Sequence, residues 1–394
     1  MAITYPNNLL TSTALTKLVN ERPELEQIRQ RYLWRTFFPP MESPERKLTW
    51  ESVRAENNLA GFYHQRDQVV PMPNDSAKQY FADLINIKAA KIVDAETVQL
   101  IRDPGMVAVY KAGEQSSHVQ GIAQRVKREI AKAVNDVDNS IEATMEYLAV
   151  NTLRGTVNWP PQDSNGNSII NVPHWNPQNR LTVTMPRNAN YAQDATTLTG
   201  WNSKEGTRVA WNQAGADPLY DLEVIGELLM EQDGVDIENA TIVLSHSTLL
   251  NLARATKIVN KLFGDDNSQN GTRSQYSFNA LKDYVKAQWG FNFFEYGAKY
   301  TYQIESGNDR PQVVNQRFLP DGEVLIIPNN MLDGGTVGNM MLGLQETVEG
   351  NFMYGKYARV HRDEKTFVNE IIDSVTAWPI IWRGQEVFKL RAYN

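Results

Sequence analysis

The fold of this chain is decided by the stretch SSHVQGIAQRVKREIAKAVNDVDNSIEATMEYLAVNTLRG, residues 116–155. Its apolar side chains recur at steps of three or four, which predicts one long amphipathic helix. Ser116 and Ser117 are possible N-caps, and Arg154 with Gly155 supplies a cation and a stop signal. The repeat drifts from a strict heptad, so it favours a helix packed on a sheet over a coiled coil. The predicted core stripe consists of Val119, Ile122, Val126, Ile130, Val134, Val137, Ile141, Met145 and Leu148.

Two segments of different character precede this helix. Residues 1–46 are polar with scattered apolar side chains and predict an extended arm, with a short helix that begins near Pro23. Residues 47–105 begin with an alternation around Leu48 and Trp50 and continue through a long polar stretch, which predicts a projecting β-hairpin. An isolated hairpin is marginal in water, so we expect its apolar side to pack on another surface.

The remaining segments predict an α+β protein. Residues 106–155 carry the long helix, and residues 156–216, rich in Asn and Trp, predict a β-excursion. Residues 217–341 alternate helical patterns with short apolar runs, which predicts a sheet covered by helices. Residues 342–394 predict strands that return to the body around the long helix, with Pro379 at an edge or a bulge.

Within residues 217–341, local signals place particular elements. The apolar runs 241–244 and 324–327 predict two buried strands. Asp217 and Pro218 predict the start of a helix. Ser245 and Ser247, which follow the first strand, are possible caps for the next helix.

Composition and charge exclude several classes of function. The chain has no cysteine, which removes disulfides, thiolate nucleophiles and cysteine-based metal sites and suits a reducing cytoplasm. The net charge of -7 gives no basic footprint for sequence-specific nucleic-acid binding, but an acidic wall can enclose a polyanion without gripping it. We expect no signal peptide, because the start lacks a basic region followed by a continuous apolar run. We expect no membrane span, because no run of about 18 apolar residues occurs in the sequence.

The motif search predicts no catalytic, metal or cofactor site. The five histidines have no metal-ligand spacing, and no glycine-rich phosphate loop occurs. His246 lies between Ser245 and Ser247 without the surroundings of a nucleophile elbow, so helix capping is favoured over catalysis. Carboxylates are numerous, but the sequence alone does not indicate which of them face each other.

One acidic loop begins like a calcium-binding loop and then departs from it. Asp163, Asn165 and Asn167 match the first three ligand positions. The sixth position is Ser168 where the loop needs Gly, and the twelfth is His174 where it needs Glu. A turn is therefore favoured over a calcium site.

The order of these elements resembles the major capsid fold of tailed bacteriophages, and specifically the lambda-type major capsid family. The likeness covers most of the chain and lies in order and spacing, since each matching piece is short. The polar stretch in the hairpin and the Asn-rich segment look longer than the family minimum. The matching pieces are Phe37-Phe38-Pro39, Leu48-Thr49-Trp50, Leu59-Ala60, Val70-Pro71, Glu146, Leu148, Leu153-Arg154-Gly155, Trp211, Ala216-Asp217-Pro218, Ala240 to Ser245 and Trp378-Pro379-Ile380.

The resemblance implies an N-terminal arm, an extended β-hairpin loop, a long spine helix, a peripheral β-sheet and an α/β axial domain. It implies a structural protein and not an enzyme. Copies of the chain would form pentamers and hexamers of an icosahedral shell around double-stranded DNA, assembled in the host cytoplasm and retained in the virion. Scaffold, decoration and portal proteins are the other implied partners, and the DNA would be enclosed without sequence-specific contact.

A ring of subunits needs heterologous interfaces, in which one patch meets a different patch of the next copy. The arm, the hairpin and the loop 264–271 are expected to supply them. The candidate interface residues are Leu25, Ile28, Tyr32, Trp34, Phe37, Phe38, Phe62, Tyr63, Val69, Val70, Asp265, Asp266, Asn267 and Arg273.

Two alternative functions stay open on the sequence. A phage-derived bacterial nanocompartment would share the fold and enclose protein cargo. A carbohydrate-active enzyme would use the abundant Trp, Tyr and carboxylates, but it would remain a small oligomer in solution.

Overall fold

The protein is described from a computed structural model. It describes residues 15–16, 32–53, 77–93, 115–159, 181–185, 187–188, 191–196, 209–232, 237–238, 240–255, 257–259, 278–304, 312–328, 337–348, 350–362 and 369–393.

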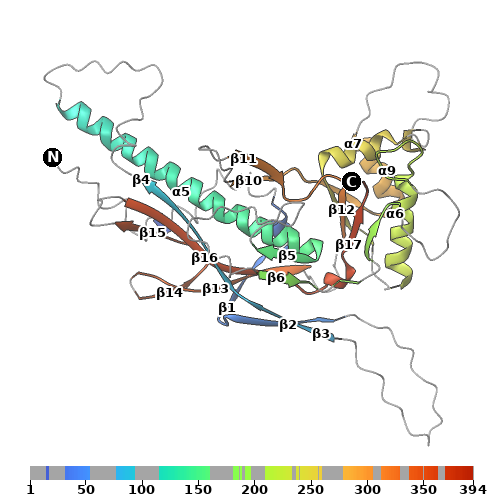
Figure 1. Cartoon of the computed structure of the whole chain (residues 1–394), viewed down its shortest axis with the longest axis horizontal. Coiled ribbons are helices and arrows are strands. Elements are labelled where there is room, and N and C mark those ends of the chain that lie inside the picture. Colours follow the sequence, from blue (N-terminus) through green and yellow to red (C-terminus); the bar gives the residue numbers. More distant parts are fainter. Residues whose placement is uncertain are drawn as a thin grey trace, which may run out of the picture.

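Helix α5 (Gln115–Arg154) dominates the molecule, as the apolar stripe predicted. It has 40 residues and lies along the six-stranded sheet (Figure 1). It ends at Gly155, whose φ of 94° is strained for residues with a Cβ. Six stripe residues are buried: Ile130, Val134, Val137, Ile141, Met145 and Leu148. Val119, Ile122 and Val126 lie on the helix, but their side chains are outside the described part.

The sheet beneath α5 is built around one long strand. Its strands are β1 (Pro40–Ser43), β4 (Ile85–Val93), β13 (Gly338–Glu346), β14 (Phe352–Tyr354), β15 (Tyr357–Arg362) and β16 (Asn369–Ile381). One edge of β16 pairs with β4, and the other pairs first with β15 and then with β13. The pairing with β4 ends at Ala377, so Pro379 lies beyond it, where its missing N–H costs no ladder bond.

The predicted hairpin is present but shorter than expected. Strands β2 (Lys47–Val53) and β3 (Ala77–Asp83) pair antiparallel, and the pair extends below the body in Figure 1. The prediction that residues 47–105 form one hairpin is wrong at its C-terminal side, because β4 leaves the pair and joins the six-stranded sheet. Buried Leu84 lies between the end of β3 and the start of β4, and its N–H donates to the carbonyl of Arg46.

A second sheet stands at the other end of the molecule. Its order is β7 (Ala192–Asp194), β17 (Phe388–Arg391), β12 (Glu323–Ile327), β8 (Thr241–Leu244) and β9 (Asn292–Glu295). The predicted buried strands are β8 and β12, which pair antiparallel. Strand β12 has alternate side chains in two core clusters, because both faces of this sheet are covered.

Three helices cover one face of the second sheet: α6 (Pro218–Glu227), α7 (His246–Arg254) and α9 (Phe278–Trp289). Asp217 caps α6, and α6 continues into a π-helical turn, η2 (Leu228–Gln232). Ser245 caps α7 through the N–H of Thr248, at 3.3 Å. The sequence predicted the helix start at Asp217 and Pro218, and Ser245 was one of the two predicted candidate caps of α7.

The boundaries of the predicted α/β unit need two corrections. Strand β13 begins at Gly338, inside the predicted range 217–341, but it belongs to the six-stranded sheet. Strand β17 was predicted to return with residues 342–394 to the first body, but it pairs with β12 of the second sheet. Buried Phe388 and Leu390 place β17 there, because their side chains complete the helix-covered core.

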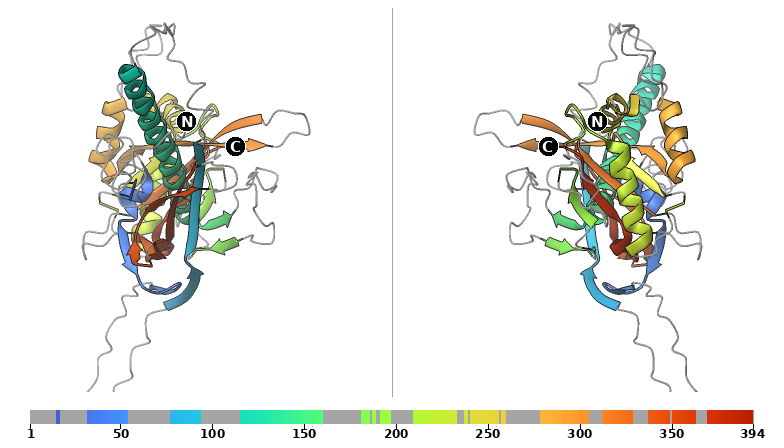
Figure 2. Two further views of the ribbon diagram at one scale, coloured as in Figure 1. Left: turned by 90° about the vertical axis from the view of Figure 1, so that its left-hand side faces the viewer. Right: turned by 90° about the vertical axis from the view of Figure 1, so that its right-hand side faces the viewer.

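Smaller elements complete the fold. The pairs β5 (Thr156–Trp159) with β6 (Leu181–Thr184) and β10 (Lys299–Ile304) with β11 (Gln312–Arg317) extend from the same side of the body (Figure 2). The first pair and β7 form the described part of the predicted β-excursion. Helix α3 (Leu33–Phe37) packs on α5. The predicted helix from Pro23 included Tyr32, but Tyr32 is extended and α3 begins only after it, and residues 17–31 lie outside the described residues.

Candidate functional site

Three carboxylates form a buried row on α5. Asp138, Glu142 and Glu146 follow at steps of four, which places them on one face of the helix. Each is at most 1% exposed. Burying a carboxylate is costly unless it is paired or hydrogen-bonded, so this row marks where other elements must supply partners.

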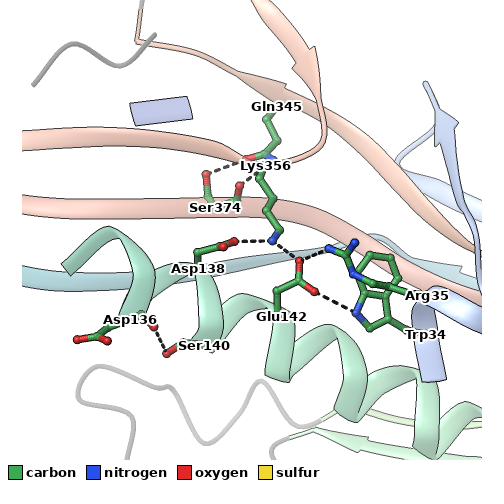
Figure 3. A network of polar contacts seen from close by, with 9 residues as sticks. All are labelled: Trp34, Arg35, Asp136, Asp138, Ser140, Glu142, Gln345, Lys356 and Ser374. Atoms are coloured by element: carbon green, nitrogen blue, oxygen red, sulfur yellow. Dashed lines mark hydrogen bonds and ion pairs between the residues drawn. The ribbon is translucent and has the colours of Figure 1, made fainter. Parts of the chain in front are cut away.

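Glu142 is the centre of an ionic cluster that joins three elements (Figure 3). The Lys356 ammonium, from the turn between β14 and β15, contacts both Glu142 and Asp138. The Arg35 guanidinium of α3 pairs with Glu142 at 3.1 Å, and Nε1 of Trp34 donates to it at 3.2 Å. The cluster therefore attaches α3 and the six-stranded sheet to the same turn of α5.

The two cations determine the charge state of Glu142. Burial alone would raise its pKa, but the neighbouring Lys356 and Arg35 lower it below the ordinary value. Glu142 therefore remains ionised, with its charge compensated inside the fold.

The turn that carries Lys356 is held by hydrogen bonds between uncharged groups. Gly355 adopts a φ of 86°, and its carbonyl accepts a hydrogen bond from the Gln345 amide. The Ser374 hydroxyl donates to Oε1 of Gln345 at 2.8 Å, and the Gln345 amide also donates to the Ser374 carbonyl at 3.1 Å. These contacts fix the direction in which Lys356 leaves the sheet.

Glu146 has a different set of partners. Its carboxylate accepts the N–H groups of Leu33 at 2.9 Å and Trp34 at 3.0 Å, and the hydroxyl of Tyr296. The first amides of a helix have no partner within it, so Glu146 satisfies two of them for α3. Burial raises the pKa of Glu146 to about 7, helped by the charge of Glu142 and opposed by the three hydrogen bonds.

The C-terminal end of α5 is joined to the second sheet by a separate ionic cluster. Arg154 forms two hydrogen bonds with Glu323 of β12, at 2.7 and 2.8 Å, and one with Asn151 at 2.9 Å. Lys389 of β17 lies 3.6 Å from Glu323. Burial alone would raise the pKa of Glu323, but the Arg154 hydrogen bonds and charge, with Lys389, lower it. The same helix thus binds α3 in its C-terminal third and the second sheet at its C-terminal end.

The predicted interface residues are only partly within the described chain. Tyr32, Trp34, Phe37 and Phe38 are described, and Trp34 and Phe38 are buried in the core of the chain itself. Those two are therefore corrected to core residues, because Trp34 contacts Glu142 of α5 and the ring of Phe38 lies over Gly338 of β13. Tyr32 and Phe37 are half-buried against the same core. The others lie outside the described residues: Leu25, Ile28, Phe62, Tyr63, Val69, Val70, Asp265, Asp266, Asn267 and Arg273.

Other apolar side chains are exposed in the described part. Phe81, on the open face of the β2–β3 pair, is 67% exposed. On the β13–β14 pair, Phe352 is also 67% exposed, with Leu344 and Val348 exposed nearby in the sequence. Exposed large apolar groups of this kind often mark interaction surfaces. Side chains of a strand alternate between its two faces, so Phe81 lies on the opposite face from its neighbour Tyr80, which pairs with buried Trp50. The sequence analysis did not predict that Phe81 is exposed.

The Ser245–His246 pair has structural contacts. Besides capping α7, the Ser245 hydroxyl donates to Asp321 at 2.5 Å, and the side chain is buried. His246 is exposed and contacts Glu295 at 2.5 Å. The two neighbouring side chains therefore serve different partners, as capping predicted.

The described residues contain neither a metal-ion cluster nor a membrane-spanning helix. Among their His, Asp and Glu side chains, no group of three is placed to hold a metal ion. None of the described helices combines the length and hydrophobicity of a membrane span. The predicted calcium-like loop from Asp163 lies outside the described residues.

Comparison with known proteins matches both the sequence and the fold. Residues 11–184, less than half of the chain, match the family model described as phage major capsid protein E. This range includes the described hairpin strands and all of α5. Comparison with curated proteins gave no match.

Solved structures match almost the whole chain. A candidate capsid protein of a prophage of E. coli CFT073 is 14% identical, with a TM-score of 0.54, over 97% of this chain and 99% of that one. A phage-related protein from Bordetella bronchiseptica RB50 has 12% identity and a TM-score of 0.49, over 97% of each chain. The capsid of Ralstonia phage GP4 has 9% identity and a TM-score of 0.45, over 91% of this chain and 90% of that one.

These matches confirm the predicted resemblance to phage major capsid proteins and the predicted α+β capsid fold. The lambda-type assignment stays a prediction.

Proposed function

We propose that this chain, whose residues 11–184 match phage major capsid protein E, forms the pentamers and hexamers of an icosahedral shell around double-stranded DNA. The match is the observation that carries the proposal. It spans the hairpin strands and the long helix, which are the parts that give the subunit its extended shape.

The physical form of the subunit supports assembly in rings. A heterologous interface joins two different patches, and the chain exposes apolar side chains on two separate strand pairs. Phe81 lies on the β2–β3 pair, while Leu344 and Phe352 lie on the β13–β14 pair. If the β2–β3 pair of one copy contacted the β13–β14 pair of the next copy, the exposed apolar side chains of both pairs would be buried.

The net negative charge of the chain supports a shell that encloses DNA without binding it tightly. At a net charge of -7 the wall would repel DNA weakly and leave it free to be packed. We include scaffold, decoration and portal proteins as further partners, and the host cytoplasm as the place of assembly. The mature chain would then be part of the virion.

The test is the size and content of the assembled protein. The full chain, expressed alone and with a scaffold protein from the same phage, is followed by light scattering and negative-stain electron microscopy. Rings, tubes or closed particles are expected. A uniform monomer under every assembly condition would overturn the proposal. For particles isolated from infected cells, DNA inside agrees with it, whereas protein cargo alone would indicate a nanocompartment instead.

A further inference from the structure

Glu146 is the joint of three segments that are far apart in the sequence. It belongs to α5, two of its donors are backbone amides at the start of α3, and the third is Tyr296, directly after β9. It is completely buried, so water does not share in its solvation. The amides at the start of α3 are therefore bound by one carboxyl group, while the side chains of Trp34 and Arg35 contact Glu142 one turn earlier.

The donors around Glu146 are all neutral. In the described part of the chain, the two cations of this region, Arg35 and Lys356, pair with Glu142 one turn earlier. The ionised Glu142 therefore adds a like charge near Glu146. The remaining titratable groups at the joint are Tyr296 itself and Tyr32, which precedes α3.

Protonation does not have to break this joint. In the protonated carboxyl group, the carbonyl oxygen can accept one of the two amide N–H groups of α3, and the hydroxyl oxygen can accept the other. The Tyr296 hydroxyl donates to the carboxylate, but a tyrosine hydroxyl can equally accept the proton of the acid. All three contacts of Glu146 can thus persist while the buried charge disappears.

We propose that Glu146 is a proton-controlled latch, which holds α3 on α5 with its proton bound and loosens that contact as the proton is lost. Closing takes up one proton from water, and opening returns the ionised carboxylate to water. The latch is a property of the single chain, so it goes beyond the proposed role in a shell.

The direction of the pH dependence follows from the environment of Glu146. Burial, followed by the charge of Glu142, raises its pKa from 4.5 to about 7 against the opposing hydrogen bonds. A raised pKa means that the closed joint is most stable below 4.5 and loses stability as the pH rises through 7. Burial and the Glu146 charge also raise the pKa of Tyr296, which stays protonated over this range.

Hydrogen exchange measured by mass spectrometry tests the latch on the full chain. Exchange of a peptide covering α3 is recorded at about pH 5, 6 and 7 and corrected for intrinsic rates. In the wild type, the opening constant of α3 is expected to rise on the order of 10- to 40-fold from pH 5 to 7. In Glu146→Gln, which keeps the shape without the titration, the opening constant is expected to stay level.

Two internal checks keep the test decisive. A peptide from α6 should show no comparable pH dependence in either protein, since α6 lies in the second core and contains no histidine. Tyr296→Phe keeps the carboxyl group and removes one stabilising hydrogen bond from its ionised form, so it should move the transition to higher pH. A level wild-type profile for α3, or an unchanged slope in a folded Glu146→Gln, would overturn the proposal.

Discussion

Lys356 and Glu142 form a buried ion pair between segments 214 positions apart in the sequence. The Lys356 ammonium comes from a turn of the six-stranded sheet and also contacts Asp138 on α5. The pair therefore fixes the position of the long helix on the sheet. It also fixes where α3 can bind, because Glu142 is shared with Arg35.

Removing the Lys356 ammonium is expected to destabilise the fold strongly. Lys356→Met removes the ammonium that contacts two buried carboxylates, Asp138 and Glu142, and breaking such a pair costs about 3–5 kcal/mol. The free energy of unfolding in urea measures the loss. The control is Lys91→Met, whose partner Asp136 is 45% exposed, where a loss below about 1 kcal/mol is expected. Equal losses in the two variants would contradict the assigned role.

The junction of Arg154 and Glu323 predicts an acid-dependent stability. The pKa of Glu323 is lowered, so its contribution is present above its ordinary value of 4.5 and is lost as the pH falls through the lowered pKa. Glu323→Gln should therefore lose about 3 kcal/mol at pH 7, and the difference from wild type should shrink with acid. Urea unfolding at several pH values measures this difference.

Glu386 provides a control of opposite sign. Burial raises its pKa despite the contact with Arg383. The stability difference between Glu386→Gln and the wild type should therefore not shrink with acid in the manner of Glu323→Gln. The same acid profile in both variants would argue against the specific role of Arg154.

The stripe of α5 predicts that a charge in its middle prevents folding. Ile130 is 6% exposed, and Ile130→Asp would place an unpaired carboxylate in the core at a cost of about 4 kcal/mol or more. Circular dichroism and size-exclusion chromatography should show loss of native structure. Lys132→Asp, on the exposed side of the same helix, should fold normally. Soluble, native Ile130→Asp protein would refute this placement of the stripe.

Gly338 is expected to tolerate no side chain. A Cβ there would lie 2.1 Å from the carbonyl oxygen of Ile380 and 2.6 Å from the ring of Phe38. Gly338→Ala should therefore lower the free energy of unfolding by about 1–3 kcal/mol. The control is Gly297→Ala, where the nearest atom is 4.0 Å away, on Arg317. Thermal unfolding of the two variants compares them, and equal stability would show that Phe38 does not pack over β13.

The open face of the hairpin predicts a defect in assembly without a defect in folding. Phe81→Ser removes an exposed ring, so the free energy of unfolding should change by less than about 0.5 kcal/mol. Light scattering should show slower or weaker assembly. Thr49→Ser, opposite Phe81 on the same face, is the control and should assemble like the wild type. Normal assembly of Phe81→Ser would remove this face from the interface.

The sequence by itself determined the elements whose signals are local. The apolar stripe predicted α5, and Gly155 predicted its end. Asp217 and Ser245 predicted the starts of α6 and α7, because a cap and its amides are three residues apart. Hydrogen bonding and burial within one element depend on nearby residues, so their pattern is written in a short stretch of sequence.

Only the tertiary structure decided how these elements combine. It assigned β4 to the six-stranded sheet and β17 to the second sheet, and it placed Trp34 and Phe38 in the core. The sequence contains many carboxylates and did not indicate that Glu142 belongs to a buried row. Its partners come from segments more than 100 positions away, and charge compensation depends on distance in space, which the pattern along one helix does not contain.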